Sequence, residues 1–175
     1  SMFGKLFDLV ILSRYGDRLC ASDHQFGFRQ GRSTDMCTMV LKECISYYTN
    51  NGSSVYCTFL DASKDFDRVE YCKLFRLFLE RNLPGVVVRI LLNMCTGHLS
   101  RVAWNGSSSS KFHVHNGVKQ GGIVSPVLFC VYMDGLLRVL VRSKIGCSVG
   151  NVYVGVLAYA NDIVLLSPTA HAMCR

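Results

Sequence analysis

The segment from Leu157 to Leu166 constrains the fold more than any other part of the chain. Two apolar runs rich in β-forming residues flank a short polar tip, Ala160-Asn161-Asp162. Apolar runs of this kind, separated by a short polar turn, are typical of a hairpin. We therefore expect a β-hairpin that presents a carboxylate and an amide at its turn.

A second apolar run, Val55 to Leu60, ends at the carboxylate of Asp61. Neighbouring strands lie only about 4.8 Å apart, so a strand end and a hairpin tip can bring acids from distant sequence positions together. Carboxylates suit Mg²⁺, and two divalent ions about 4 Å apart stabilise the attacking and leaving oxygens in phosphoryl transfer. The alternative is that Asp61 caps a helix and that Asn161-Asp162 only makes a turn.

Four segments, taken in order, resemble successive motifs of one known family. They are Gln25 to Thr34, Phe59 to Val69, Gln120 to Phe129, and Tyr159 to Asp162. The motifs are similar to those of the reverse transcriptases of non-LTR (LINE-type) retrotransposons, and the resemblance runs from about residue 25 to residue 167. It implies an RNA-directed DNA polymerase that uses two Mg²⁺ ions, with Mn²⁺ as the alternative. The implied partners are an RNA template, a DNA primer and deoxynucleoside triphosphates.

The same resemblance implies an α+β fold in which an antiparallel sheet packs on helices. It would be the palm of a polymerase with part of the fingers, within one partial domain that spans residues 1–175. Residues from about 1 to 50 would form the edge of the fingers, and residues from about 51 to 175 the palm. A thumb and an endonuclease would lie outside these 175 residues. An alternative function is a catalytically inactive, nucleic-acid-binding remnant with the same fold.

The metal site is inferred from positions that match the family's motifs. Asp61 and Asp162 match catalytic metal ligands, and Ala62 matches a metal contact made through the backbone carbonyl. The family has Tyr-Ala-Asp-Asp at the hairpin, whereas this chain has Asn161 at the first acidic position. An amide oxygen can ligate a hard cation but contributes no charge. The resemblance therefore implies a weakened catalytic site at Asn161.

Other positions match the family's nucleotide contacts. Phe66 matches the aromatic gate that selects deoxynucleotides by a clash with a ribose 2′-hydroxyl; the alternative is a core aromatic. Gln120 and Gly121 match a loop that lies against the incoming nucleotide and the template. Arg29 and Arg32 are candidates to hold the triphosphate, because a guanidinium fork fits phosphate geometry; the alternative is a solvated basic loop.

Asp65 is a second departure from the family. The family usually has a small residue immediately before the aromatic gate, at a position near the incoming triphosphate. A carboxylate at this position is expected to repel the triphosphate.

Composition agrees with these expectations. Nineteen Lys and Arg residues against twelve Asp and Glu give a net charge of +7, which favours polyanionic partners but also fits any basic soluble protein. The nine cysteines form no Cys-x-x-Cys pair, so we expect reduced and mostly buried thiols. No stretch reaches the roughly 18 apolar residues of a membrane span, so no membrane partner is expected. An intracellular, cytoplasmic and nuclear location is expected.

Local patterns predict the remaining elements. Ser33 or Thr34 is expected to cap a helix that ends near Thr49, and Ser125-Pro126 is expected to open another that ends near Arg142. Further helices are expected over residues 70–83 and 86–96, on either side of Pro84. Asn105-Gly106 and the serine tract are expected to form the loop between strands 101–104 and 111–115. The last hairpin is expected to pair residues 152–159 with 163–167.

Overall fold

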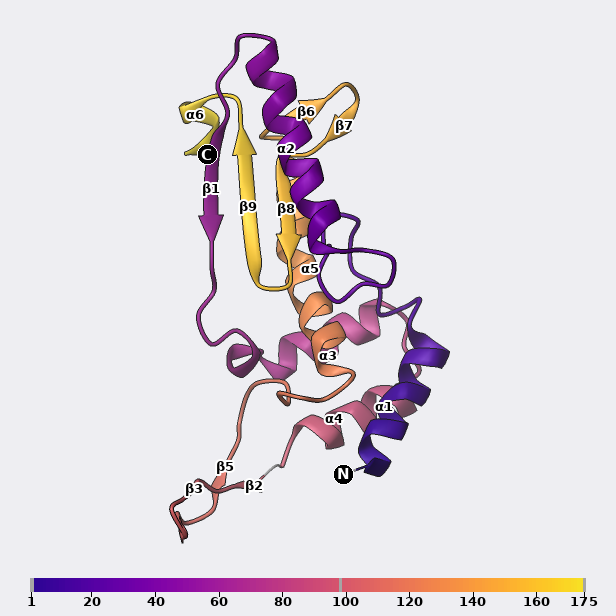
Figure 1. Ribbon diagram of the computed structural model, residues 1–175. Helices are drawn as coiled ribbons and strands as arrows, with labels where there is room; N and C mark the ends of the chain where they lie inside the picture. Colours follow the sequence, from indigo (N-terminus) through magenta and orange to yellow (C-terminus); the bar gives the residue numbers. More distant parts are fainter. Residues whose placement is uncertain (1, 98, 175) are drawn as a thin grey trace. The chain divides into compact units, whose positions relative to one another are not determined.

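The computed structural model describes residues 2–97 and 99–174, and the chain divides into two compact units (Figure 1). Unit 1 contains Ser1–Leu19 and Lys64–Tyr132, and unit 2 contains Cys20–Ser63 and Met133–Arg175. Each unit is therefore built from two segments that are distant in the sequence.

Unit 2 contains a three-stranded antiparallel sheet with the order β1-β9-β8. Its strands are β1 (Tyr56–Leu60), β8 (Val156–Tyr159) and β9 (Asp162–Ser167). The expected hairpin is confirmed, because β8 and β9 are paired directly through the short turn between Tyr159 and Asp162. The expected strand before Asp61 is confirmed as β1, which lies at the edge of the sheet.

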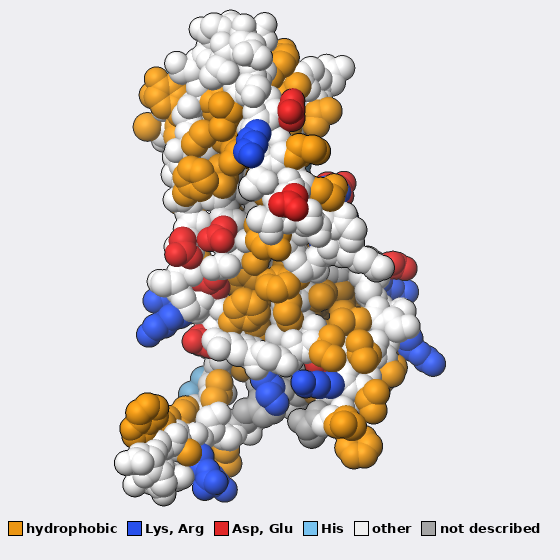
Figure 2. Space-filling model, in the orientation of Figure 1, with side chains coloured by type: hydrophobic (Ala, Val, Ile, Leu, Met, Phe, Trp, Pro, Cys, Tyr) orange, Lys and Arg blue, Asp and Glu red, His pale blue; other side chains and the backbone are white. Residues whose placement is uncertain are grey.

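Helices cover both faces of β8. One buried cluster joins Cys44 of α2 (Thr34–Asn50) to Leu157 and Leu166 of the sheet. A second cluster places Leu137 of α5 (Ser125–Ser143) against β8 and β9. All of β8 except its last residue is buried, whereas much of β1 is exposed, and hydrophobic side chains lie over this edge of the sheet in Figure 2.

The predicted helix of unit 2 begins where its capping residue indicates. The side chain of Ser33 accepts a hydrogen bond from the backbone N–H of Met36 at 3.2 Å. This bond satisfies one of the N–H groups that the first turn leaves unpaired. A short helix, α6 (Ala170–Met173), follows β9 and is capped in the same way by Thr169.

The last hairpin differs from the prediction, because residues 152–159 do not form one strand. A separate hairpin joins β6 (Ser148–Val149) to β7 (Val152–Tyr153), and the ladder resumes only at Val156. A Cβ at Gly155 would lie 2.6 Å from the hydroxyl of Tyr153. The break at Gly155 therefore leaves room for the Tyr153 side chain, which folds back over the chain.

Unit 1 is mainly helical. Its helices are α1 (Met2–Tyr15), α3 (Tyr71–Glu80), α4 (Gly85–Cys95) and the first part of α5, with a 3₁₀ turn η1 at Phe66–Arg68. The helices α3, α4 and α5 confirm the predicted ranges to within three residues at each end. The helix α1 has no counterpart among the predicted elements.

The predicted pairing after α4 is wrong. The strands β3 (Ala103–Trp104) and β4 (Ser107–Ser108) are joined by Asn105-Gly106 alone, so part of the serine tract is strand and not loop. Both turn residues have positive φ, 45° and 78°, as a type I′ two-residue turn requires. A separate pair joins β2 (Leu99–Ser100) to β5 (Phe112–His113).

The cysteines correct another expectation. No disulfide joins any of the nine within the described residues, but only Cys44, Cys130 and Cys147 are buried. Four others are exposed, on helices, loops and the edge strand β1: Cys20, Cys57, Cys72 and Cys174. The thiols are therefore not mostly buried. Within residues 2–97 and 99–174 the structure contains no helix with the length and apolar character needed to cross a membrane.

Candidate active site

The turn of the β8–β9 hairpin has an unusual backbone. Tyr159 pairs with Asp162, so Ala160 and Asn161 are the only two turn residues. Ala160 has φ of 57°, in the left-handed region that favours glycine. A residue with a Cβ pays roughly 1–2 kcal/mol for this conformation. Surrounding contacts must therefore hold the turn.

The side chain of Gln25 makes those contacts. Its Nε2 donates to the carbonyl oxygen of Ala160 at 3.0 Å, and its Oε1 accepts from the backbone N–H of Ala160 at 2.9 Å. The same Oε1 accepts from the backbone N–H of Gly27 at 2.9 Å. Gln25 is fully buried, so these bonds are formed away from water and fix the hairpin tip.

Backbone contacts join the same segment to β8. The N–H of Phe26 donates to the carbonyl of Ala158 at 2.7 Å, and the N–H of Ala158 donates to the carbonyl of His24 at 2.8 Å. A Cβ at Gly27 would collide with the backbone nitrogen of Ala160 and lie 2.9 Å from its Cα. Only glycine fits at this close approach of two backbones.

Asp61 meets the hairpin tip, as the sequence predicts. The β1–β9 ladder ends with Leu60 paired to Ile163, so the next residue of each strand, Asp61 and Asp162, emerges at the same end of the sheet. The side-chain Nδ2 of Asn161 lies 3.4 Å from Oδ1 of Asp61, although 100 residues separate the two. Figure 2 shows acidic side chains beside the end of β1.

The donor set at this end of the sheet is small. It has two exposed carboxylates, Asp61 and Asp162, and the partly exposed amide of Asn161. Within the described part of the chain, no group of three or more His, Cys, Asp or Glu side chains is arranged to hold a metal ion. Two carboxylates and an amide oxygen are hard oxygen donors of the kind that Mg²⁺ and Ca²⁺ prefer.

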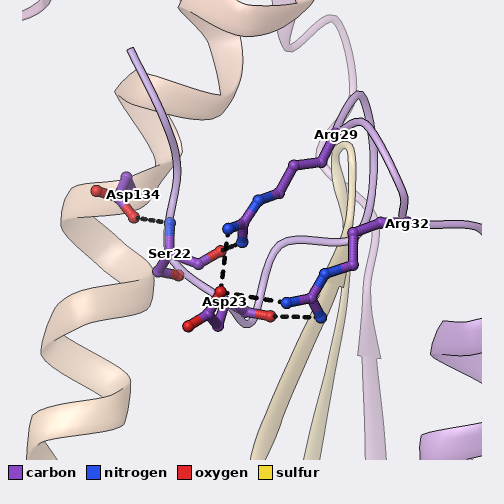
Figure 3. Close-up of polar contacts among 5 residues, drawn as sticks. All are labelled: Ser22, Asp23, Arg29, Arg32 and Asp134. Atoms are coloured by element: carbon purple, nitrogen blue, oxygen red, sulfur yellow. Dashed lines mark hydrogen bonds and ion pairs between the residues drawn. The ribbon is translucent and has the colours of Figure 1, made fainter. Parts of the chain in front are cut away.

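The guanidinium groups of Arg29 and Arg32 converge on one carboxylate, that of Asp23 (Figure 3). Their Nη2 atoms lie 3.0 Å and 3.2 Å from Asp23 Oδ1. Arg29 also donates to the carbonyl of Ser22 at 2.8 Å, and Arg32 lies over the ring of Phe26 at 5.1 Å. The Asp23 side chain is 79% exposed, so the cluster lies at the surface.

A buried acid on α5 anchors this cluster. Asp134 is 1% exposed and accepts from the backbone N–H of Ser22 at 2.7 Å (Figure 3). Arg138, one helical turn later, pairs with the other oxygen of Asp134 at 2.8 Å. The loop that carries the two guanidinium groups is thereby attached to the helix.

Two other predicted site residues, Phe66 and Gln120, belong to unit 1. The half-buried ring of Phe66 stacks on Phe129, with the ring centroids 4.8 Å apart, and its carbonyl accepts from the N–H of Val118 at 2.7 Å. Gln120 is exposed and lies 3.5 Å from a carboxylate oxygen of Asp67. The loop 117–122 is therefore held against the turn η1.

The remaining predicted positions fall on both sides of the boundary between the units. Gly121 is exposed and has φ of 79°, which glycine adopts without strain. Ala62 is exposed and belongs to unit 2, beside Asp61. Asp65 is partly buried and belongs to unit 1, at the start of η1.

The structure brings together two sets of predicted residues: Asp61 with Asn161, and Arg29 with Arg32. Sequence reasoning missed the roles of Gln25, Asp23 and Asp134. Gln25 stood at the start of a recognised motif, which was a usable signal. No local sequence pattern marks Asp23 or Asp134, because the residues that they contact are brought to them only by the folded chain.

Comparison with known proteins shows that this chain is similar to the reverse transcriptases. A family model described as "Reverse transcriptase (RNA-dependent DNA polymerase)" matches residues 9–174. The Pol polyprotein of the type-2 retrotransposable element R2DM of Drosophila melanogaster is 37% identical over 116 residues, 66% of this chain and 11% of its own length. A type-1 element R2 polyprotein of Nasonia vitripennis is 25% identical over 167 residues, 95% of this chain and 16% of its own length.

Solved structures show the same fold at low identity. Telomerase from Candida albicans, in complex with a fragment of telomeric RNA, superposes with a TM-score of 0.63 at 12% identity, over 98% of this chain and 31% of its own. Apo telomerase from Candida tropicalis gives 0.60 at 10% identity, over 99% and 34%. The chain thus spans about a tenth to a sixth of these two polyproteins and about a third of the telomerases.

Proposed function

Because the chain belongs to the reverse transcriptase family, we propose that it forms the palm and the edge of the fingers in an RNA-directed DNA polymerase of a non-LTR retrotransposon. The observation that carries the proposal is the meeting of Asp61 with the hairpin tip, where Asn161 lies 3.4 Å from its carboxylate. An RNA template, a DNA primer and deoxynucleoside triphosphates would be its partners, in the cytoplasm and the nucleus.

Members of this family use divalent metal ions, and here Asp61 and Asp162 would hold Mg²⁺, with the backbone carbonyl of Ala62 as a further ligand. Bound Mg²⁺ supplies charge stabilisation to the attacking and leaving oxygens. Rotation of the Asn161 amide would turn its oxygen, instead of its nitrogen, toward this site. The tip carries one negative charge fewer than a site with three acids, so a second ion would bind weakly.

The remaining residues would orient the substrate. Arg29 and Arg32 already point to one position, now occupied by the Asp23 carboxylate, and a triphosphate would compete with that carboxylate for the same donors. In unit 1, Phe66 would exclude a ribose 2′-hydroxyl, and its stacking on Phe129 would keep the ring rigid. Gln120 and Gly121 would contact the incoming nucleotide and the template.

Primer extension tests the proposal. The chain, incubated with a DNA primer on an RNA template and all four deoxynucleoside triphosphates, should extend the primer slowly, and Asp61→Asn should abolish extension. Asp35→Asn, which removes an exposed acid from the first turn of α2, is the matched control and should leave the rate unchanged.

The second candidate function is a nucleic-acid-binding remnant without catalysis, and the amide at Asn161 favours it. It predicts salt-dependent binding of the primer and template but no extension, even when position 161 is restored to Asp. Extension by Asn161→Asp would exclude the remnant. Extension that survives Asp61→Asn would contradict the proposed metal site.

A further inference from the structure

Unit 1 encloses a cavity of about 460 Å³ beside the loop 117–122. Side chains from α1, α4 and α5 line it, among them Asp8, Leu91, Cys95 and Leu128. Its volume lies within the roughly 300–1,000 Å³ that small-molecule sites occupy. No residue expected to hold metal contributes to its lining.

Asp8 lies in the middle of α1 and is only 5% exposed. Its Oδ2 accepts from the backbone N–H groups of Ile123 at 3.0 Å and Val124 at 3.4 Å. These residues immediately precede α5, whose N-terminal end carries a partial positive charge. The Oδ2 atom of Asp8 is therefore stabilised as a cap on the start of α5.

The other oxygen, Oδ1 of Asp8, is buried and has no hydrogen-bond partner among residues 2–97 and 99–174. A buried acceptor without a partner is costly, roughly 1–3 kcal/mol for a neutral group and more for a charged one. Asp8 also lines the cavity, so a donor in the cavity that reached Oδ1 through a small movement of the side chain would remove this cost.

The lining determines which donor fits. Leu91, Leu128 and Met94 form apolar walls, and Asp67 adds a second carboxylate against the single cation of Lys119. Burial and the nearby Asp8 raise the pKa of the Cys95 thiol to about 11, so this side chain stays neutral at physiological pH. A cavity with apolar walls and a net excess of one acid disfavours anions.

We propose that this cavity binds a small organic cation, an amidinium or ammonium group on a compact apolar body, which donates to Oδ1 of Asp8. The apolar body lies against Leu91, Met94 and Leu128, and the cation replaces the missing partner of the carboxylate. An occupant would tie α1 to the loop that carries Gln120, because both line the same cavity.

Benzamidine and benzylamine are suitable probes for the full chain, measured by calorimetry at low salt. Both should bind, and benzamide, which has the size of benzamidine but no charge, should bind at least about tenfold more weakly because it cannot form a charge-assisted hydrogen bond. The Met94 methyl resonance should shift on binding, whereas that of Met39, on α2 of unit 2, should not.

Asp8→Asn tests the assignment of the carboxylate. The amide oxygen can still accept from Ile123 and Val124, so the cap on α5 is kept while the charge is lost. Binding should fall at least about tenfold, and Asp17→Asn, an exposed acid just after α1, should bind as the unmodified chain does.

Equal affinity for benzamidine and benzamide, an unmoved Met94 methyl, or full binding by Asp8→Asn would each overturn the proposal. Absence of binding by both cations would do so as well, and would leave a cavity filled by water only. If Asp8→Asn does not fold by circular dichroism, Asp67→Asn replaces it, with weaker benzamidine binding expected and unchanged binding contradicting the site.

Discussion

The side-chain amide of Gln25 forms hydrogen bonds to both the N–H and the carbonyl of Ala160, across 135 residues of sequence. One planar group thus reproduces the pairing that a neighbouring strand would offer. It does so at the residue with left-handed φ, next to Asn161 and Asp162. The position of the proposed metal ligands therefore depends on a residue that would not touch the metal.

Replacing Gln25 by Ala should destabilise unit 2. The change leaves the N–H and the carbonyl of Ala160 buried without the Gln25 partner, at roughly 1–3 kcal/mol for each group, and it also removes the hydrogen bond from Gly27. Urea unfolding should show a loss of at least about 3 kcal/mol in the free energy of unfolding, and Mn²⁺ should bind more weakly. Gln30→Ala, at an exposed position of the same loop, is the control and should change neither quantity. A stable Gln25→Ala chain with unchanged Mn²⁺ affinity would refute the positioning role.

A single methyl group at Gly27 should act on the same turn. The Cβ of Gly27→Ala would collide with the backbone of Ala160, and neither backbone has a flexible end that could move aside. Overpacking of this kind costs typically 1–3 kcal/mol, measured as a lower midpoint in urea. Gly31→Ala is the control. Its φ of 74° is positive but no atom lies within 4 Å of the added Cβ, so this variant measures backbone strain without crowding.

The arrangement around Asp23 leads to a prediction about binding. Asp23→Asn removes the carboxylate that pairs with Arg29 and Arg32, so a primer-template duplex should bind more tightly, most clearly at low salt. Arg32→Ala should weaken binding and lower the slope of log K against log salt by about 0.9, the value for one phosphate contact. Arg76→Ala removes the same charge from an exposed pair on α3 and should leave the slope unchanged. Equal slopes for Arg32→Ala and the unmodified chain would place Arg32 outside the interface.

Local chemistry explains which parts of the fold were predictable. Ser33 marks the start of α2 because the cap bond lies within three residues, and the hairpin at residues 157–166 follows from its own pattern. Asn105-Gly106 is typical of a two-residue turn, which pairs Trp104 with Ser107. A longer loop that also contains the serine tract is incompatible with this register. The helix α1 was missed because Asp8 interrupts its apolar run, and only the folded chain supplies the N–H groups of Ile123 and Val124 that donate to this buried acid. Gln25, Asp23 and Asp134 depend on partners far along the chain, which no local pattern encodes.

The buried thiols should differ from the exposed ones in reactivity. Burial, followed by the neighbouring Cys44, raises the pKa of Cys147 to about 12, so only about one molecule in ten thousand is a thiolate at pH 8. Iodoacetamide at pH 8 should alkylate the exposed Cys72 and Cys174 well before Cys147, as peptide mass spectrometry can measure. Because the folded pKa lies above the ordinary value of 9.0, the stability linked to this thiol is present below pH 9 and lost as the pH rises toward 12. Early alkylation of Cys147 in the folded chain would show that its site opens to solvent.

Restoring the acid at the hairpin tip should have the largest effect on catalysis. Asn161→Asp adds a negative charge beside Asp61, where a second divalent ion would bind weakly, and each 1.36 kcal/mol recovered is tenfold in rate. In the chain joined to the thumb of a relative, primer extension should rise by roughly a hundredfold, a gain of about 3 kcal/mol from better charge stabilisation. The Mg²⁺ concentration for half-maximal rate should fall as well.

Asp65→Ala is the comparison that makes this test selective. It removes one negative charge from the net charge of the site residues' side chains, but the repulsion relieved falls toward about 1 kcal/mol at 4 Å when water intervenes, which is less than the gain of about 3 kcal/mol expected from Asn161→Asp. Its gain in extension rate should therefore be smaller, with no change in the Mg²⁺ requirement. The double variant should show the product of the two gains if the positions act independently. No gain from Asn161→Asp, or a larger gain from Asp65→Ala, would mean that the amide at 161 does not limit the site.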